Sequence, residues 1–229
     1  MFKLLSWNIR QGGGSRITKI TKSLQSFNAD VIVLSEFRNN EGGHKIRHNL
    51  LRLGYRFQNV TNAKSNDNAV ATFSKIPCNL NVFLSADEKY THNVNCSVFE
   101  AFNIYGVYLP HKKKHKLFDF LLEEIKQDKP CIIVGDYNTG INHVDQKGKS
   151  FWYTDKMEAL SEHGCVDAFR FLHGKVSEYS WYSHQGNGYR YDHTYVSKAL
   201  IPIVKSCYYL HEWRENGLSD HSPMVLELG

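Results

Sequence analysis

The chain has 229 residues, of which 41% are hydrophobic, and it carries a formal charge of +5 with a pI near 8.8. This length allows a sizeable core, and no linker, repeat or low-complexity tract divides it, so we expect one domain over residues 1–229. The N-terminus turns polar too soon for a signal peptide, and no apolar run approaches the ~20 residues of a membrane span.

Five scattered cysteines without CxxC spacing fit neither a disulfide framework nor a thiolate zinc site. We therefore expect a reduced, cytoplasmic protein with no membrane association and no protein partner. The basic excess is mild, so it is compatible with a polyanionic partner without requiring one.

The hydrophobic pattern predicts strands alternating with helices. Helices are expected near residues 15–26, 45–53, 117–125 and 156–162. Strands are expected at 2–7, 31–34, 55–60, 69–74, 95–99, 104–109, 131–134, 191–196, 204–210 and 224–228. Helices separate some neighbouring strands and hairpin-like connections join others, which favours mixed sheets covered by helices, an α/β fold.

The most informative stretch is the apolar run 131–134, which breaks abruptly into Gly135, Asp136, Tyr137 and Asn138. Alternate residues of an extended chain share a face, so Asp136 and Asn138 would point the same way. Asp and Asn also bond their own backbone in turns, so this stretch taken alone is equally compatible with an ordinary turn.

Other strand-like runs also end or begin on polar residues that could share one site: Asn8, Glu36, Asp192, and Asp220 with His221. Each has an ordinary alternative when taken alone. Glu36 could be an exposed loop carboxylate, and His221 is one of 12 histidines.

Four blocks carry a family resemblance when they are taken in order: Trp7-Asn8, Ser35-Glu36, Gly135-Asp136-Tyr137-Asn138 and Ser219-Asp220-His221-Ser222-Pro223. Together they resemble the endonuclease/exonuclease/phosphatase superfamily, and the likeness spans essentially the whole chain. The resemblance implies the DNase I-like fold. This is a four-layer α/β sandwich in which two mixed, mainly antiparallel sheets pack face to face with helices outside.

Further blocks are similar to one branch, that of exonuclease III and the apurinic/apyrimidinic endonucleases: residues 68–75, 105–110, 166–170, 179–182 and 189–192. This branch implies a phosphodiesterase acting in DNA repair as an abasic-site endonuclease, a 3′-5′ exonuclease, or both. Its partner would be double-stranded DNA with abasic sites or 3′ ends.

Phosphodiester hydrolysis needs an activated water, a neutralised phosphate and a stabilised leaving oxygen, and a divalent ion can supply the last two. The candidate groups other than the imidazole are oxygen or amide groups, which favours Mg²⁺ or Mn²⁺ over zinc. The expected metal ligands are Glu36 first, with Asn8 and Asp220 nearby.

The resemblance also implies roles in the reaction itself. Asp136 would orient or deprotonate the attacking water, while Asn138 and Tyr108 would donate hydrogen bonds to the phosphate oxygens. His221 would be a second polar group that contacts the phosphate. Asp192 would fix the tautomer of His221 and support its positively charged form.

Aromatic and basic residues are the candidates for nucleic-acid binding. Trp181, Tyr189 and Tyr191 match positions that wall the pocket for a flipped-out abasic sugar, although core packing would explain such rings equally well. Four cations would neutralise backbone phosphates and make binding fall with salt: Lys112, Lys113, Lys114 and Arg190. A solvated helix start would also explain the lysine run.

The chain departs from the family pattern in two places that bear on function. Arg10 stands where relatives often carry Asp or Asn, which puts a second acidic metal position in doubt. The loop 183–188 is short where abasic-site enzymes often have a longer, duplex-penetrating one. The open alternatives are another phosphoesterase of the superfamily, acting on single-stranded DNA, RNA or a small phosphorylated molecule, and a catalytically dead nucleic-acid-binding module.

Overall fold

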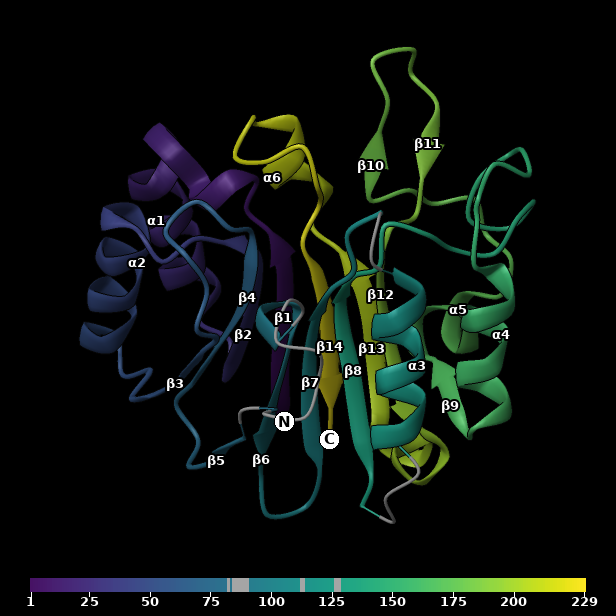
Figure 1. Cartoon of the computed structure of the whole chain (residues 1–229), viewed down its shortest axis with the longest axis horizontal. Helices are drawn as coiled ribbons and strands as arrows, with labels where there is room; N and C mark the ends of the chain where they lie inside the picture. Colours follow the sequence, from purple (N-terminus) through teal and green to yellow (C-terminus); the bar gives the residue numbers. More distant parts are fainter. Residues whose placement is uncertain (82, 84–90, 112–113, 126–128) are drawn as a thin grey trace.

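The computed structural model describes residues 1–81, 83, 91–111, 114–125 and 129–229. Two six-stranded sheets pack face to face, with helices covering their outer sides (Figure 1). The strand orders are β13-β14-β1-β2-β4-β3 and β5-β6-β7-β8-β12-β9. Only the β1–β2 and β7–β8 pairs are parallel among these neighbours. The expected four-layer α/β sandwich is confirmed.

The first sheet consists of β1 (Phe2–Asn8), β2 (Val31–Phe37), β3 (Phe57–Val60), β4 (Ala69–Ser74), β13 (Val204–Tyr209) and β14 (Met224–Leu228). The second consists of β5 (Asn79–Asn81), β6 (Val94–Val98), β7 (Asn103–Tyr108), β8 (Cys131–Asp136), β9 (Cys165–Asp167) and β12 (Asp192–Ser197). A separate ribbon pairs β10 (Trp181–Tyr182) with β11 (Gly188–Tyr189).

The α-helices are α1 (Ile17–Phe27), α2 (Glu41–Arg52), α3 (Lys114–Glu124), α4 (Thr154–Glu162), α5 (Ala168–His173) and α6 (His211–Glu215). Short 3₁₀ segments are η1 (Gln11–Arg16), η2 (Thr91–Asn93) and η3 (Lys198–Ile203). Helices α1 and α2 lie outside the first sheet, and α3 and α4 lie outside the second (Figure 1). No helix in the described part of the chain is long and apolar enough to span a membrane.

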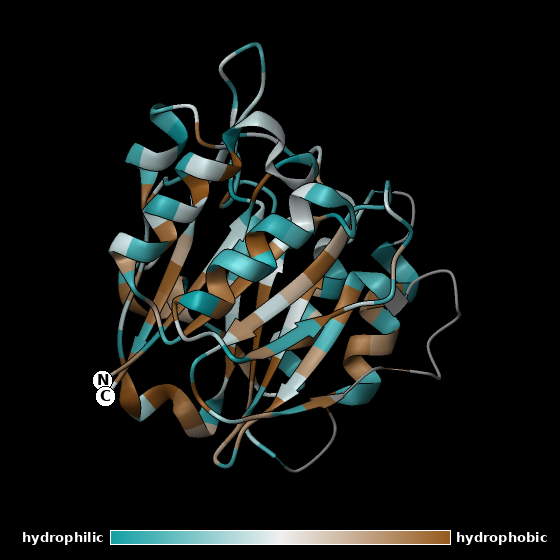
Figure 2. Cartoon of the chain, turned by 90° about the vertical axis from the view of Figure 1, so that its left-hand side faces the viewer, coloured by the Kyte–Doolittle hydropathy of each residue, from teal (hydrophilic) through white to brown (hydrophobic). Residues whose placement is uncertain are grey.

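The strand residues alternate between two hydrophobic layers, which explains why each sheet is buried on both faces. In β1, Leu4 packs between the sheets and Leu5 packs under the helices; in β8, Ile132 and Ile133 divide in the same way. The helices carry both hydrophobic and hydrophilic stretches, as expected for elements with one face on a sheet (Figure 2).

Two helix starts differ from the sequence expectation for identifiable reasons. Ser15 does not cap a helix, because residues 11–16 form a 3₁₀ segment containing glycines with positive φ and α1 begins at Ile17. Helix α2 begins four residues earlier than the predicted 45, because the Asn40 side chain accepts a hydrogen bond from the backbone N–H of Gly43 and caps it.

Candidate active site

Four polar side chains lie at strand ends on the inner faces of the sheets. Asn8 ends β1, Tyr108 ends β7, Asp136 ends β8 and Asp192 begins β12. In each strand, a hydrophobic residue that packs between the sheets lies an even number of positions from the polar residue, so the two side chains share one face. The register places Asp136 opposite both Asp192 and Tyr108. These side chains therefore meet at one edge of the sandwich.

Glu36 reaches the same place through a backbone irregularity. The pairing of β2 with β4 shifts between Ser35 and Phe37, and Glu36 has a φ of 52°. Its Oε1 lies 3.3 Å from Asn8 Nδ2 and 3.4 Å from the Tyr108 hydroxyl, which donates to it. The bulge thus turns a carboxylate of the first sheet toward a phenol of the second.

Asn8 and Asn138 both bind the Asp136 carboxylate. Asn8 Nδ2 donates to Asp136 Oδ2 at 2.8 Å, and Asn138 Nδ2 donates to the same oxygen at 3.1 Å. The backbone N–H of Asn138 donates to Asp136 Oδ1 at 2.8 Å, and Asn138 has a φ of 49°. A tight turn, in place of the expected strand alternation, therefore brings Asn138 beside Asp136.

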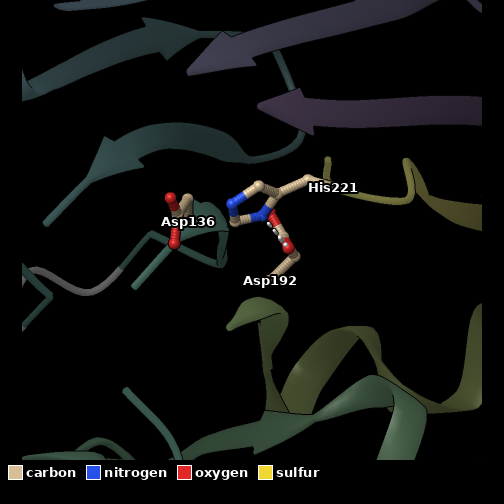
Figure 3. A group of neighbouring side chains, drawn as sticks. All are labelled: Asp136, Asp192 and His221. Carbon is tan, nitrogen blue, oxygen red and sulfur yellow. Dashed lines mark hydrogen bonds and ion pairs between the residues drawn. The ribbon is translucent and has the colours of Figure 1, made fainter. Parts of the chain in front are cut away.

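His221 and Asp192 form the opposite side of the group (Figure 3). His221 Nδ1 donates to Asp192 Oδ2 at 2.8 Å, and the other ring nitrogen is turned toward Asp136. The indole N–H of Trp7 donates to the His221 carbonyl at 3.0 Å and holds the loop that carries His221. Because the Asp192 carboxylate accepts this bond, His221 Nδ1 carries a proton.

Burial and charge shift the titration of both groups. Burial raises the pKa of Asp136 above its ordinary value; the Asp192 charge adds to the rise, and His221 opposes it. Burial alone would lower the pKa of His221, but the charges of Asp192 and Asp136 outweigh it and raise that pKa to about 10. At neutral pH the imidazole is therefore positively charged.

Asp220 contacts a different set of side chains. Its Oδ2 accepts from Trp181 Nε1 at 3.3 Å and lies 3.8 Å from Arg10 Nε. Arg10 thus places a positive charge where the family pattern has an acidic or amide residue, and this charge offsets that of Asp220.

The predicted aromatic residues line one cavity beside these groups. Trp181, Tyr189 and Tyr191 contribute to a cavity of about 690 Å³, and Asn138 lies on its wall. Lys114 also lines it and is only 3% exposed, with its Nζ donating to the Asn138 carbonyl. Burial lowers the pKa of Lys114 to about 8, although Asp136 opposes the shift.

A family model described as "Endonuclease/Exonuclease/phosphatase family" matches residues 5–221. The chain belongs to this family. It is 26% identical over 254 residues to the DNA-(apurinic or apyrimidinic site) endonuclease of Dictyostelium discoideum, covering 97% of this chain and 69% of that protein.

Two solved structures share the fold. An AP endonuclease from Archaeoglobus fulgidus has a TM-score of 0.86 at 20% identity, covering 100% of this chain and 99% of the other. A 3′ phosphatase from Neisseria bound to a product DNA hairpin has a TM-score of 0.85 at 21% identity, covering 100% of both chains. The predicted family membership is confirmed, and at these identities the structural likeness establishes the fold alone.

Members of the endonuclease/exonuclease/phosphatase family use divalent metals, and the described side chains offer two places for one. Asp136, Asp192 and His221 have donor atoms within 4.8 Å of one another, and no described residue hydrogen-bonds the buried Asp192 Oδ1. The second place is Glu36, which is partly exposed beside Asn8. Carboxylate and amide oxygens suit Mg²⁺ or Mn²⁺, so the residues present fit such an ion.

The predicted phosphate contact of Arg190 is wrong. Its side chain is fully buried, with Nε 2.7 Å from Asp145 Oδ1 and Nη2 2.5 Å from Asp167 Oδ2. Two carboxylates distant in sequence hold the guanidinium inside the domain, where DNA does not reach it. Lys114 likewise faces the cavity instead of forming an outer rim, and Lys112 and Lys113 lie outside the described residues.

Sequence reasoning missed the other wall of the cavity, which Phe151, Trp152, Tyr153 and His111 supply. The signal available was three consecutive aromatic residues after the polar stretch 145–150. Nothing in the local pattern placed these rings in the same cavity as Trp181, because only the folded loop brings them there.

Proposed function

We propose that this protein is a divalent-metal-dependent phosphodiesterase that hydrolyses the DNA backbone, as an exonuclease III-like nuclease at abasic sites, 3′ ends, or both. The observation that carries the proposal is convergence: side chains from both sheets and from the loop after α6 meet beside one cavity. The names of the relatives support a DNA substrate.

Asp136 would orient and deprotonate the attacking water. It is buried, it is fixed by Asn8 and Asn138, and its raised pKa makes its carboxylate a stronger base than an exposed one. Because both amides hold the same oxygen, Oδ2, the direction of proton transfer would be set by the fold before substrate arrives.

The phosphate would meet three donors. Burial and the neighbouring carboxylates Glu36 and Asp136 raise the pKa of Tyr108, so its hydroxyl keeps its proton and can donate. Asn138 would donate through its amide, and His221 would present a positive ring stabilised by Asp192. Such pre-positioned donors favour the transition state, where negative charge accumulates.

A bound Mg²⁺ or Mn²⁺ would neutralise the phosphate and stabilise the departing oxygen. Glu36 and Asn8 would hold the ion. Asp220 would attract it from farther away, and the positive charge of Arg10 would weaken that attraction.

The proposal is tested by incubating purified protein with labelled DNA in Mg²⁺ or in EDTA. The substrates are duplex with one tetrahydrofuran abasic analogue, intact duplex with a recessed 3′ end, single-stranded DNA and RNA. We expect metal-dependent cleavage of DNA, slowed ~100-fold or more by Asp136→Asn or His221→Ala. His163→Ala, at an exposed histidine after α4, is the matched control and should retain full activity.

Cleavage that persists in EDTA would reject the metal requirement. Preference for RNA over every DNA substrate would reject the proposed substrate, and no cleavage of any substrate by a folded protein would support a catalytically dead binding module.

A further inference from the structure

Aromatic rings from two segments line the cavity beside the catalytic group. In one segment the rings of Tyr189 and Tyr191 stack, with centroids 5.4 Å apart and planes 12° apart, and the Trp181 ring centroid lies 5.4 Å from that of Tyr191. The consecutive residues 151–153 supply the other lining rings, and we call them the Phe151–Tyr153 side. At about 690 Å³ the cavity lies within the ~300–1,000 Å³ of pockets that bury a whole drug-sized ligand.

The Phe151–Tyr153 side is built into the fold. Phe151 is 8% exposed, and its ring centroid lies 5.9 Å from that of Tyr189 and 5.8 Å from that of Tyr191. Asn142 binds both backbone groups of Phe151, and the Thr139 hydroxyl donates to the Trp152 carbonyl at 2.6 Å. The backbone of this segment is therefore held in position before any ligand binds.

Trp152 is the exception within this held segment, because its side chain is 76% exposed. The Trp152 indole is exposed to water and lines the cavity, and its backbone is already held in position. It can therefore stack on a ligand with little further loss of backbone entropy. A baseless sugar, with about half the atoms of a nucleoside, would leave much of such a cavity unfilled.

We propose that this cavity holds a nucleotide that keeps its base, with the base stacked on the Phe151–Tyr153 side, so that cleavage at an ordinary 3′ end is preferred to cleavage at an abasic site. The inference rests on the proposed function and specifies its substrate. Lys114, a buried cation on the cavity wall, complements the phosphate that a base-bearing and an abasic nucleotide share, so the preference rests on the rings.

The test compares two DNA hairpins that differ only at the 3′-terminal position, which carries either a normal nucleotide or tetrahydrofuran. Affinity is measured in EDTA by fluorescence anisotropy, and kcat/KM is measured in Mg²⁺. Because stacking of one base on an aromatic ring strengthens binding ~5- to 150-fold (~1–3 kcal/mol), we expect the base-bearing hairpin to bind at least ~5-fold more tightly.

Trp152→Ala should reduce this preference to within about threefold, and Trp152→Phe should retain part of it. Phe171→Ala is the matched control, because Phe171 is also an exposed aromatic residue, at 52%, and does not line the cavity. It should leave the preference intact.

Equal affinity for the two hairpins, or a preference that Trp152→Ala leaves unchanged, would overturn the inference. Metal-dependent cleavage of either hairpin would still support the proposed function. A hairpin pair that is neither bound nor cut would instead reject both.

Discussion

Replacing Arg190 with methionine should destabilise the protein without acting on DNA contacts. Arg190 is fully buried and bridges Asp145 and Asp167, and removing its charge leaves two buried carboxylates with fewer partners. Arg170 stays 2.6 Å from Asp145, so Asp167 loses most; the nearest ring nitrogen of His193 lies 3.6 Å from it.

Breaking a buried ion pair by removing one partner costs about 3–5 kcal/mol. We expect the lower end, about 3 kcal/mol, because Arg170 still compensates Asp145. Total stabilities are ~5–15 kcal/mol, and each kcal/mol moves the midpoint of a domain this size by roughly 2–4 °C. The Tm of Arg190→Met should therefore fall by about 6–12 °C.

Thermal and urea unfolding followed by circular dichroism measure this loss. Arg52→Met, at an exposed arginine in the last turn of α2, is the control and should change stability by less than about 0.5 kcal/mol. Adding Asp167→Asn to Arg190→Met should recover part of the loss, because the unpaired charge disappears. An unchanged Tm combined with weaker, less salt-dependent DNA binding would refute the structural role and restore the phosphate contact.

Three further outcomes are expected. Burial alone would raise the pKa of Asp167, but the charge of Arg190 outweighs burial and lowers that pKa. The ionised Asp167 therefore stabilises the fold above pH ~4, and this stabilisation is lost as the pH falls further. Urea titrations from pH 7 to 3 should show this loss of stability, and in Arg190→Met the dependence of stability on pH should reverse. Gly135→Ala should lower the free energy of unfolding by about 3 kcal/mol or more in urea, because the new Cβ would lie 1.9 Å from the Val107 carbonyl oxygen. Gly186→Ala is the control; it has open space around it and should lower the free energy of unfolding by about 1 kcal/mol. Arg10→Asn should tighten Mn²⁺ binding roughly three- to tenfold in calorimetric titration, and equal affinity would show that its charge is not felt at the metal site.

Part of the site follows from strand periodicity alone. Asn8, Tyr108, Asp136 and Asp192 continue the inward-facing positions of their strands, so a period of two placed each on the inner face. The motif order identified the family that the model over residues 5–221 confirms. The approximate positions of the core strands also followed from their apolar runs, because burial on both faces demands them.

Other features depended on contacts that no local pattern encodes. Glu36 turns inward only because β2 bulges against β4, and register between paired strands is a tertiary property. The positive charge of Arg190 led us to predict a surface residue that binds phosphate. The carboxylates that it contacts, Asp145 and Asp167, lie 45 and 23 residues away in the sequence.

The sequence by itself determined the family, the layered α/β architecture and the inward direction of most catalytic candidates, because these depend on residue order and on a repeat of two. The tertiary structure alone decided that Arg190 is buried, that Arg10 lies within ion-pair distance of Asp220, and that residues 151–153 line the same cavity as Trp181. A side chain's environment is set by whichever distant segments the fold packs against it, and that information appears only when the loops between the strands are in place.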